Sequence, residues 1–254
     1  MPEPWRTGKV VRIENETSTT RRFWIEVPEL DAFNFKPGQF VTLDLPIHEM
    51  KNKRWRSYSI ASNPDGTNIF ELVIVLLEGG LGTTYLFNEV TEGSELILRG
   101  PQGVFTLPDA IEKDLYFICT GTGIAPFRSM IKNIQLHSLP FKNMYLIFGC
   151  RKFSDALYGP EMQALASQIP GFNYYACYSR EEVDGNDPFM RSGYVHKVFE
   201  ELCTAKAMQN EGSEKILSPA SFYLCGWKNM IDEAKQKIIA MGYDKKDVHF
   251  ELYG

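Results

Sequence analysis

The chain has 254 residues, of which 44% are hydrophobic and 23% charged, and it carries a net charge of −5 at pH 7. These values predict a soluble globular protein of one or two domains and argue against generic nucleic-acid binding. No apolar run reaches the roughly 18 residues of a membrane helix, and the N-terminus lacks a signal-peptide core, so we expect a cytoplasmic protein without a membrane partner.

The first part of the chain, up to about residue 105, predicts short strands, because polar and apolar residues alternate there. A helix is expected near 83–89, directly after a glycine turn. The expected strands are 9–13, 22–27, 40–45, 56–62, 70–76 and 95–100. Short strands separated by turn residues at this spacing predict an antiparallel barrel or a sandwich.

The strand that begins at Arg56 combines a cation, a phenol and two hydroxyls. Because successive side chains of a strand face opposite ways, Arg56 and Tyr58 are expected on one face. A fixed guanidinium beside an aromatic plane suits a ligand that has both a pyrophosphate and a flat ring. Taken alone, the same pattern also fits an ordinary edge strand.

From about residue 113 strands and helices alternate, which predicts a doubly wound parallel sheet with helices on both faces. The expected strands are 115–119, 144–149, 172–178, 221–225 and 248–252. The expected helices are 125–136, 159–168, 195–207 and 228–241. The change of rhythm places a domain boundary within 106–113, so that the predicted domains are 1–108 and 109–254.

A glycine turn, Gly121-Thr122-Gly123, follows the first strand of this second region and leads into a helix. Glycines at such a turn let the backbone of a helix N-terminus approach a phosphate closely. Pro126 stands where the usual dinucleotide fingerprint has its third glycine, so a tight strand-to-helix connection is the alternative.

The five cysteines are odd in number and form no Cys-x-x-Cys pair, which argues against a disulfide framework and an iron–sulfur cluster. The four histidines show no metal-ligand spacing, and we expect no metal site.

Five segments of this chain match the ferredoxin–NADP(+) reductase family in order, and the resemblance covers nearly the whole chain. They are Arg-Ser-Tyr-Ser at 56–59, Gly-Gly-Leu-Gly-Thr at 79–83, Gly-Pro-Gln-Gly-Val-Phe at 100–105, Gly-Thr-Gly-Ile-Ala-Pro at 121–126 and Cys-Gly at 225–226. The resemblance implies an N-terminal antiparallel β-barrel for FAD, followed by an α/β doubly wound parallel sheet for NADP. It also implies an oxidoreductase that moves electrons between NADPH and ferredoxin or flavodoxin.

Carried over from the family, Arg56 pairs with the FAD pyrophosphate, Tyr58 packs on the flavin, and Ser59 lies near flavin N5. The backbone of the strand around residue 74 contacts the ring edge, and the glycine turn before the first helix holds the pyrophosphate. The FAD-binding set implied by the resemblance is Arg56, Ser57, Tyr58, Ser59, Val73, Val75, Gly82 and Thr83.

For the nucleotide, the resemblance implies that the glycine turn approaches the pyrophosphate and nicotinamide, and that Cys225 lies against the nicotinamide. Arg180 or Arg151 would select the 2′-phosphate, and Tyr194 would stack on adenine with help from Arg191. The implied nucleotide-binding set is Gly121, Thr122, Gly123, Cys150, Arg151, Ser179, Arg180, Arg191, Tyr194, Cys225 and Gly226. Near the C-terminus, Glu251 is implied as a proton relay or a tuner of electron exit, and Tyr253 as a flavin-stacking residue. Ser59, Cys225 and Glu251 are the expected catalytic residues.

The run Lys51, Lys53 and Arg54 is basic in an acidic chain and is either a solvated loop or a collar that guides an acidic redox protein. Two other functions remain open. One is an NADH-dependent reductase that serves a separate oxygenase or heme protein, and the other is a flavin- or nucleotide-binding regulatory subunit. The oligomeric state is not predicted.

Overall fold

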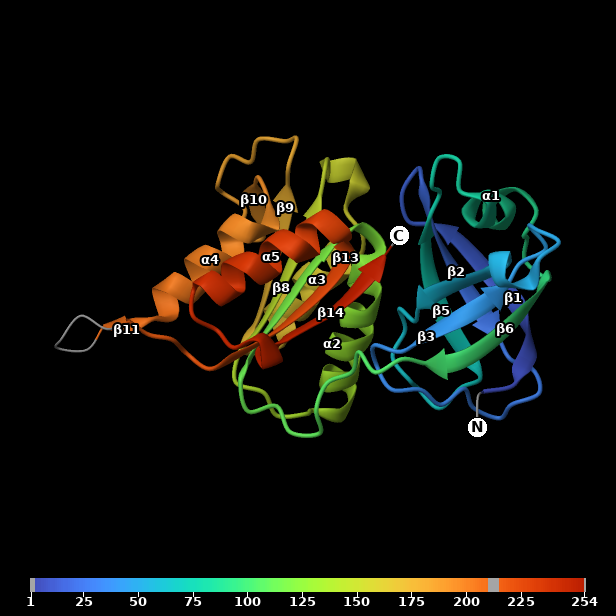
Figure 1. Cartoon of the computed structure of the whole chain (residues 1–254), viewed down its shortest axis with the longest axis horizontal. Coiled ribbons are helices and arrows are strands. Elements are labelled where there is room, and N and C mark those ends of the chain that lie inside the picture. The colour runs from blue at the N-terminus through green and yellow to red at the C-terminus, as the bar shows by residue number, and fades with distance from the viewer. Residues whose placement is uncertain (1–2, 210–214, 254) are drawn as a thin grey trace. The chain divides into compact units, whose positions relative to one another are not determined.

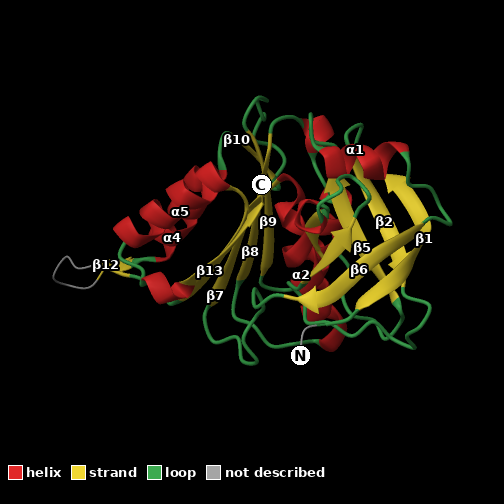
Figure 2. Ribbon diagram, turned by 45° about the vertical axis from the view of Figure 1, so that its right-hand side comes forward, coloured by secondary structure: helices red, strands yellow, loops and turns green. Residues whose placement is uncertain are grey.

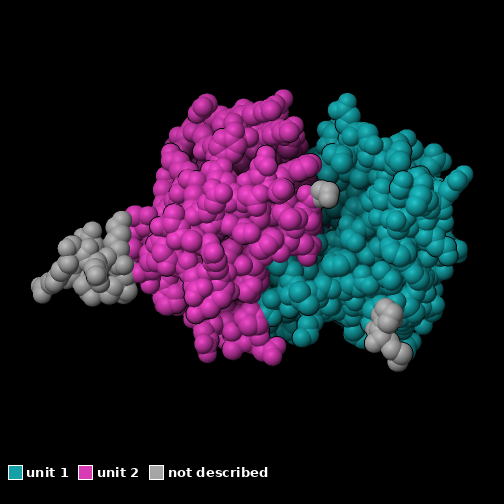
Figure 3. All heavy atoms as spheres, in the orientation of Figure 1, with its two compact units in different colours: residues 1–107, 125–139 teal, residues 108–124, 140–254 magenta. Residues whose placement is uncertain are grey.

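The computed structural model describes residues 3–209 and 215–253, and the chain divides into two compact units (Figure 3). The barrel unit comprises residues 1–107 and 125–139, and the sheet unit comprises residues 108–124 and 140–254. The segment 125–139 therefore groups with the barrel although it lies between strands of the sheet unit in sequence. The predicted domain boundary after residue 108 stays a prediction.

The barrel unit contains a six-stranded antiparallel sheet, as predicted (Figure 1). Its strand order is β4-β3-β6-β1-β2-β5, and an isolated bridge between Ile60 and Leu72 links the end of β4 to β5. The strands are β1 (Trp5–Asn15), β2 (Thr20–Glu26), β3 (Phe40–Asp44), β4 (Trp55–Ser59), β5 (Ile69–Val75) and β6 (Glu95–Gln102). The helical segments are η1 (Lys51–Lys53) and α1 (Leu81–Asn88).

The barrel core forms from the apolar residues that alternate along these strands, such as Val41 and Leu43 of β3. Helix α2 (Ala125–His137) joins this unit through Phe127, whose ring centroid lies 5.9 Å from that of Phe105. Gly38 has φ +99°, and a Cβ there would overlap the Phe105 carbonyl, so the turn before β3 requires glycine.

The sheet unit contains a six-stranded parallel sheet of order β10-β9-β8-β7-β13-β14. The strands are β7 (Asp114–Thr120), β8 (Met144–Cys150), β9 (Phe172–Tyr178), β10 (Met190–Ser192), β13 (Ala220–Trp227) and β14 (Val248–Tyr253). From β7 the chain moves outward through β8 and β9, then returns to β13 on the other side of β7. The reversal between β7 and β13 is the topological switch point at which open α/β sheets bind ligands.

Helices α4 (Val195–Lys206) and α5 (Lys228–Ala240) pack on one face of this sheet through a shared apolar cluster (Figures 1 and 2). Six of the seven residues of β7 are buried, which requires cover on both faces of the sheet. The other elements of this unit are η2 (Gly121–Ile124), η3 (Phe153–Asp155), α3 (Gly159–Gln168), η4 (Lys245–Asp247) and the small pair β11 (Met208–Gln209) with β12 (Lys215–Ile216).

The sequence did not predict β10 or the β11–β12 pair, since strands of two or three residues leave no periodicity to detect. None of the helices in the described part of the chain has the length and apolar character that spanning a bilayer requires.

Candidate functional site

Arg56 of β4 lies against the first turn of α1 in the barrel unit. A Cβ placed on Gly82 would stand 3.0 Å from Arg56 Cγ and 3.2 Å from its Nε, so a larger residue here would push the Arg56 side chain aside. The guanidinium Nη1 donates to the carbonyls of Lys53 at 3.0 Å and Trp55 at 2.8 Å. The motif strand and the glycine turn, separated by more than 20 residues in sequence, therefore meet in one place.

The N-terminus of α1 presents backbone donors at this place. Thr84 N donates to Gly80 O, so the amides of Leu81, Gly82 and Thr83 precede the first intrahelical hydrogen bond. The N-cap residue is Gly80, which has no side chain that could cap these amides. Helix amides with a guanidinium beside them form a cradle for a pyrophosphate, so these residues fit the FAD that the sequence predicts.

The Thr83 hydroxyl makes its hydrogen bonds within the turn that precedes α1. It accepts a hydrogen bond from Leu77 N at 3.1 Å and lies 3.1 Å from Gly80 O, which fixes the turn before α1. Its side chain thus shapes the cradle, and the Thr83 amide is the group placed for an anion.

Tyr58 shares its strand face with Arg56 and packs against the barrel core. Burial raises the pKa of Tyr58 to about 12, although Arg56 lowers it, so the phenol stays neutral in the physiological range. Ser57 faces the other way, and its hydroxyl lies 3.0 Å from that of Thr42. Ser59, at the end of β4, is 4% exposed.

The predicted ring-edge contacts lie on β5. This strand is last in its sheet and pairs with β2 through Val73 and Val75. Because the bridge between Ile60 and Leu72 is antiparallel, the residues of β5 after Leu72 run in the direction that leads back along β4. The contact of the Val73 and Val75 backbone with the ring edge stays a prediction.

In the sheet unit, the glycine turn meets the end of β13 at the switch point. A Cβ on Gly123 would overlap the Cys225 carbonyl, and one on Gly226, with φ +137°, would overlap the Thr120 hydroxyl. Gly121 has φ +53°. Glycine at these positions lets the two strand ends approach at backbone distance, which is the arrangement for binding an extended phosphate ligand.

Cys225, Glu251 and Tyr253 lie together beside this turn. Cys225 is directly opposite Glu251 in the β13–β14 pairing. Burial, reinforced by Glu251, raises the pKa of the Cys225 thiol well above its usual range, while a hydrogen bond with Tyr253 lowers it. The thiol is therefore neutral, which suits packing against a flat ring better than nucleophilic attack.

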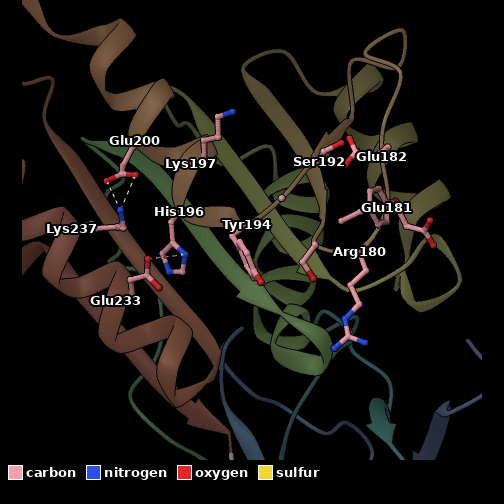
Figure 4. Close-up of a pocket in the computed structure, with 13 residues that line it drawn as sticks. Arg180, Glu181, Glu182, Ser192, Tyr194, His196, Lys197, Glu200, Glu233 and Lys237 are labelled. Carbon is pink, nitrogen blue, oxygen red and sulfur yellow. Dashed lines mark hydrogen bonds and ion pairs between the residues drawn. The ribbon is translucent and has the colours of Figure 1, made fainter.

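A pocket of about 780 Å³ opens beside the ends of β9 and β10 (Figure 4). It brings together Ser179, Arg180 and Tyr194, as the sequence predicts, and the Tyr194 side chain is 69% exposed. The backbone of Arg180 is fixed by its N–H, which donates to the Arg151 carbonyl at 2.9 Å. An exposed cation and an accessible ring in one pocket can hold a phosphate monoester and a base.

Part of the pocket wall was not predicted from sequence. These residues lie on α4 and α5: His196, Lys197, Glu200, Glu233 and Lys237. Lys237 Nζ lies 3.0 Å from Glu200 Oε1, and His196 Nδ1 lies 3.7 Å from Glu233 Oε1 (Figure 4). His196 Nε2 lies 3.1 Å from Met230 O. The first turns of α4 directly follow Tyr194, so the sequence could have indicated that α4 residues line the same pocket. Nothing in the sequence indicates that residues of α5 lie near Arg180.

Of the eleven predicted nucleotide residues, only Ser179, Arg180 and Tyr194 line this pocket, and the side chains of Arg191 and Cys150 make contacts outside it. Arg191 lies over the Tyr175 ring, 4.9 Å from its centroid, and donates to the carbonyl oxygens of Pro188 and Met190. The thiol of Cys150 donates to Lys152 O, and burial raises its pKa to about 12. Arg191 thus supports the sheet edge, and Cys150 contributes through its carbonyl, which accepts from Ser179 N at 3.0 Å.

Comparison with known proteins agrees with this geometry. Residues 7–107 match the family model of the oxidoreductase FAD-binding domain, and residues 117–236 match that of the oxidoreductase NAD-binding domain. The chain is 32% identical to ferredoxin–NADP reductase B of Sorangium cellulosum, over 99% of this chain and 98% of that protein. It is 28% identical to the glycine betaine monooxygenase reductase subunit of Pseudomonas aeruginosa, over 99% of this chain and 66% of that protein.

Solved structures share the fold. A ferredoxin NADP+ reductase from Neisseria gonorrhoeae with bound FAD and NADP has a TM-score of 0.78 at 24% identity, over 98% of both chains. An Amycolatopsis cytochrome P450 reductase has a TM-score of 0.81 at 24% identity, over 98% of this chain and 70% of that one. With the two cofactor-binding domains and the match to a reductase over its full length, the chain belongs to the ferredoxin–NADP reductase family of FAD- and NAD(P)-binding oxidoreductases.

Proposed function

We propose that this enzyme transfers electrons between NADPH and a one-electron carrier protein of the ferredoxin or flavodoxin type. The observation that carries the proposal is the pocket that holds Ser179, Arg180 and Tyr194 together. FAD, when bound, supplies the ability to accept two electrons as hydride and to release them singly. The chain contributes binding, orientation and electrostatics.

In the barrel unit, Arg56 and the α1 amides hold the FAD pyrophosphate, and the neutral Tyr58 packs on the flavin. Ser59 presents its hydroxyl near flavin N5. In the sheet unit, the turn that contains Gly123 receives the nucleotide pyrophosphate, and the neutral Cys225 thiol packs on the nicotinamide. Glu251, beside Cys225, is the carboxylate placed to relay a proton or to tune electron exit.

NADPH is proposed over NADH because Arg180 and the Ser179 hydroxyl suit a phosphate monoester. Glu181 and Glu182 also line the pocket, so Arg180 offsets carboxylates that would otherwise repel a 2′-phosphate. Loss of this guanidinium therefore removes an attraction and leaves a repulsion, and both effects disfavour NADPH.

The electron acceptor is proposed to dock near the basic run. Lys51 and Lys53 are exposed in η1, and the Lys53 carbonyl is held by Arg56, which ties this loop to the FAD cradle. Arg54 is committed to Asp44, whose Oδ1 lies 2.7 Å from its Nε. The two lysines are thus the free positive charges of the run, and they suit an acidic redox protein.

The second candidate is a reductase component that uses NADH and serves an oxygenase. It is favoured by the glycine betaine monooxygenase reductase relative, although the chain spans 66% of that protein. Membership of an oxidoreductase family argues against the third hypothesis, a regulatory subunit without turnover.

The decisive experiment compares NADPH and NADH as donors to the purified yellow protein, with a small dye as acceptor. We expect a higher kcat/KM for NADPH, mostly through KM, and Arg180→Ala should erode the preference by about 1.5–3 kcal/mol. Arg12→Ala, an exposed arginine of β1 in the barrel unit, is the matched control. Equal efficiency with both nucleotides in the unmutated protein would support the NADH-dependent alternative instead.

A further inference from the structure

A buried cluster of charges lies in the barrel unit, and none of its members has been assigned to a ligand above. Glu71 of β5 and Arg128 of α2 are 2% and 3% exposed. Arg22 of β2, which is partly exposed, completes the cluster. A buried charge destabilises the fold unless it is paired and hydrogen-bonded. The partners of each charge in this cluster therefore indicate which parts of the barrel unit it connects.

Glu71 is shared between the two arginines. Arg22 Nε donates to its Oε1 at 2.6 Å, and Arg128 Nη1 lies 2.9 Å from its Oε2. Arg128 Nη1 also donates to the backbone carbonyl of Ala61 at 2.8 Å. Arg128 thus connects α2 both to the carboxylate of β5 and to the main chain that follows β4.

The segment held in this way is the continuation of the Arg-Ser-Tyr-Ser motif. Ala61 N donates to Glu71 O at 2.8 Å, and Glu71 N donates to the Ser62 hydroxyl at 3.0 Å. Ile60 N donates to Gln39 O at 3.0 Å. The barrel strands therefore fix the segment from one side, and Arg128 fixes the carbonyl two residues after Ser59.

A hydrophobic pair of similar volume would serve stability about as well as a buried ion pair. An arginine is better suited than an apolar residue to a task that requires one side chain to hold a carboxylate and a carbonyl at once. Helix α2, which supplies Arg128, begins directly after the glycine turn that ends at Ile124.

We propose that Arg128 is a positioning residue for the reaction: by holding the Ala61 carbonyl, it fixes the backbone that carries Ser59 against the flavin. The proposal rests on the proposed function, in which Ser59 presents its hydroxyl near N5. Arg22 binds the other oxygen of the same carboxylate from β2, which makes it the natural comparison.

The test uses Arg128→Lys with Arg22→Lys as the matched control, both as FAD-loaded protein. Lysine keeps the charge beside Glu71, but its side chain is shorter and its N–H groups are tetrahedral, whereas the planar Nη1 of Arg128 donates to both acceptors. For Arg128→Lys we expect unchanged FAD content, KM for NADPH within about twofold, and single-turnover flavin reduction slowed about tenfold or more. The amides of Ile60 and Ala61 should exchange about tenfold faster with solvent deuterium, and the visible circular dichroism of the flavin should change.

Arg22→Lys should leave the reduction rate and these amides unchanged. If both variants slow reduction equally, or if Arg128→Lys loses rate without any change in exchange or dichroism, the positioning role is wrong. A second variant, Glu71→Leu with Arg128→Met, removes the charges together and so avoids a buried unpaired ion; reduction at the unmutated rate in that folded variant would also overturn the proposal. If NADPH fails to bleach the unmutated protein, the proposed function fails, while the exchange and dichroism measurements still test Arg128.

Discussion

The substitution Gly123→Ala tests whether the approach of the glycine turn to β13 is needed for nucleotide binding. An added Cβ would overlap the Cys225 carbonyl carbon and oxygen and would stand 3.0 Å from Gly226 N. All three are backbone atoms of a central strand, so they cannot move aside as a flexible side chain could. The turn must shift instead.

The cost of such overpacking is about 1–3 kcal/mol. A turn displaced from β13 also misplaces the backbone that faces the nucleotide pyrophosphate, and about 1 Å of misplacement can cost a hundredfold in rate. We therefore expect kcat/KM for NADPH to fall by about ten- to a hundredfold. FAD content should not change, because the cradle formed by Arg56 and Gly82 lies in the barrel unit.

The assay is steady-state NADPH oxidation with a dye acceptor, together with the flavin-to-protein absorbance ratio and the thermal midpoint. Gly159→Ala is the matched control, since a Cβ at this first residue of α3 has no atom within 4 Å. Unchanged kinetics for Gly123→Ala in a protein of unchanged thermal midpoint would refute the close-approach argument.

Three further outcomes follow from the site and the core. Arg56→Ala should weaken FAD retention at least tenfold through loss of a charge-assisted contact of about 2 kcal/mol, and a normal flavin content after gel filtration would contradict that role. Lys51→Glu with Lys53→Glu should slow reduction of an acidic carrier protein at low salt but not reduction of a neutral dye, and equal rates for both acceptors would remove the docking role. Burial raises the pKa of Cys177 from its usual 9.0 to about 12, so the unfolded chain loses this proton first as pH rises. The free energy of unfolding should then fall between pH 9 and pH 12 by up to about 1.4 kcal/mol per pH unit from this group, and urea titrations should show a shallower fall for Cys177→Ala.

The two fold classes were predictable because each leaves its own periodicity in the sequence. The prediction of strand 172–178 and of helix 159–168 agrees with β9 and α3 to the residue. Strands such as β7, buried on both faces, are short apolar runs between turns, and the helices between them show apolar residues at helical spacing. Strands and helices with a regular pattern of buried residues can therefore be predicted from the sequence alone.

The grouping of α2 with the barrel could not be predicted in this way. Its position after β7 is that of a helix of the sheet unit, yet Phe127 and Arg128 contact the barrel residues Phe105 and Glu71. The sequence around a buried arginine in a helix does not indicate which carboxylate pairs with it. The pairing with Glu71 depends on residues 57 positions apart, which only the folded chain brings together.

The candidate site shows the same division between local and long-range information. Alternation along β4 correctly placed Arg56 and Tyr58 on one face of the strand. The same alternation turns the Ser57 hydroxyl toward Thr42. A residue can therefore belong to the motif without directing its side chain to a ligand.

Gly123 and Cys225 are about 100 residues apart, and each alone permits an ordinary structural explanation. They meet because β13 lies next to β7, on the opposite side from β8 and β9. This strand order cannot be read from either segment alone. A glycine that tolerates no Cβ and a neutral buried thiol at that point are more informative together than either motif, because the switch point of an open α/β sheet is where ligands bind.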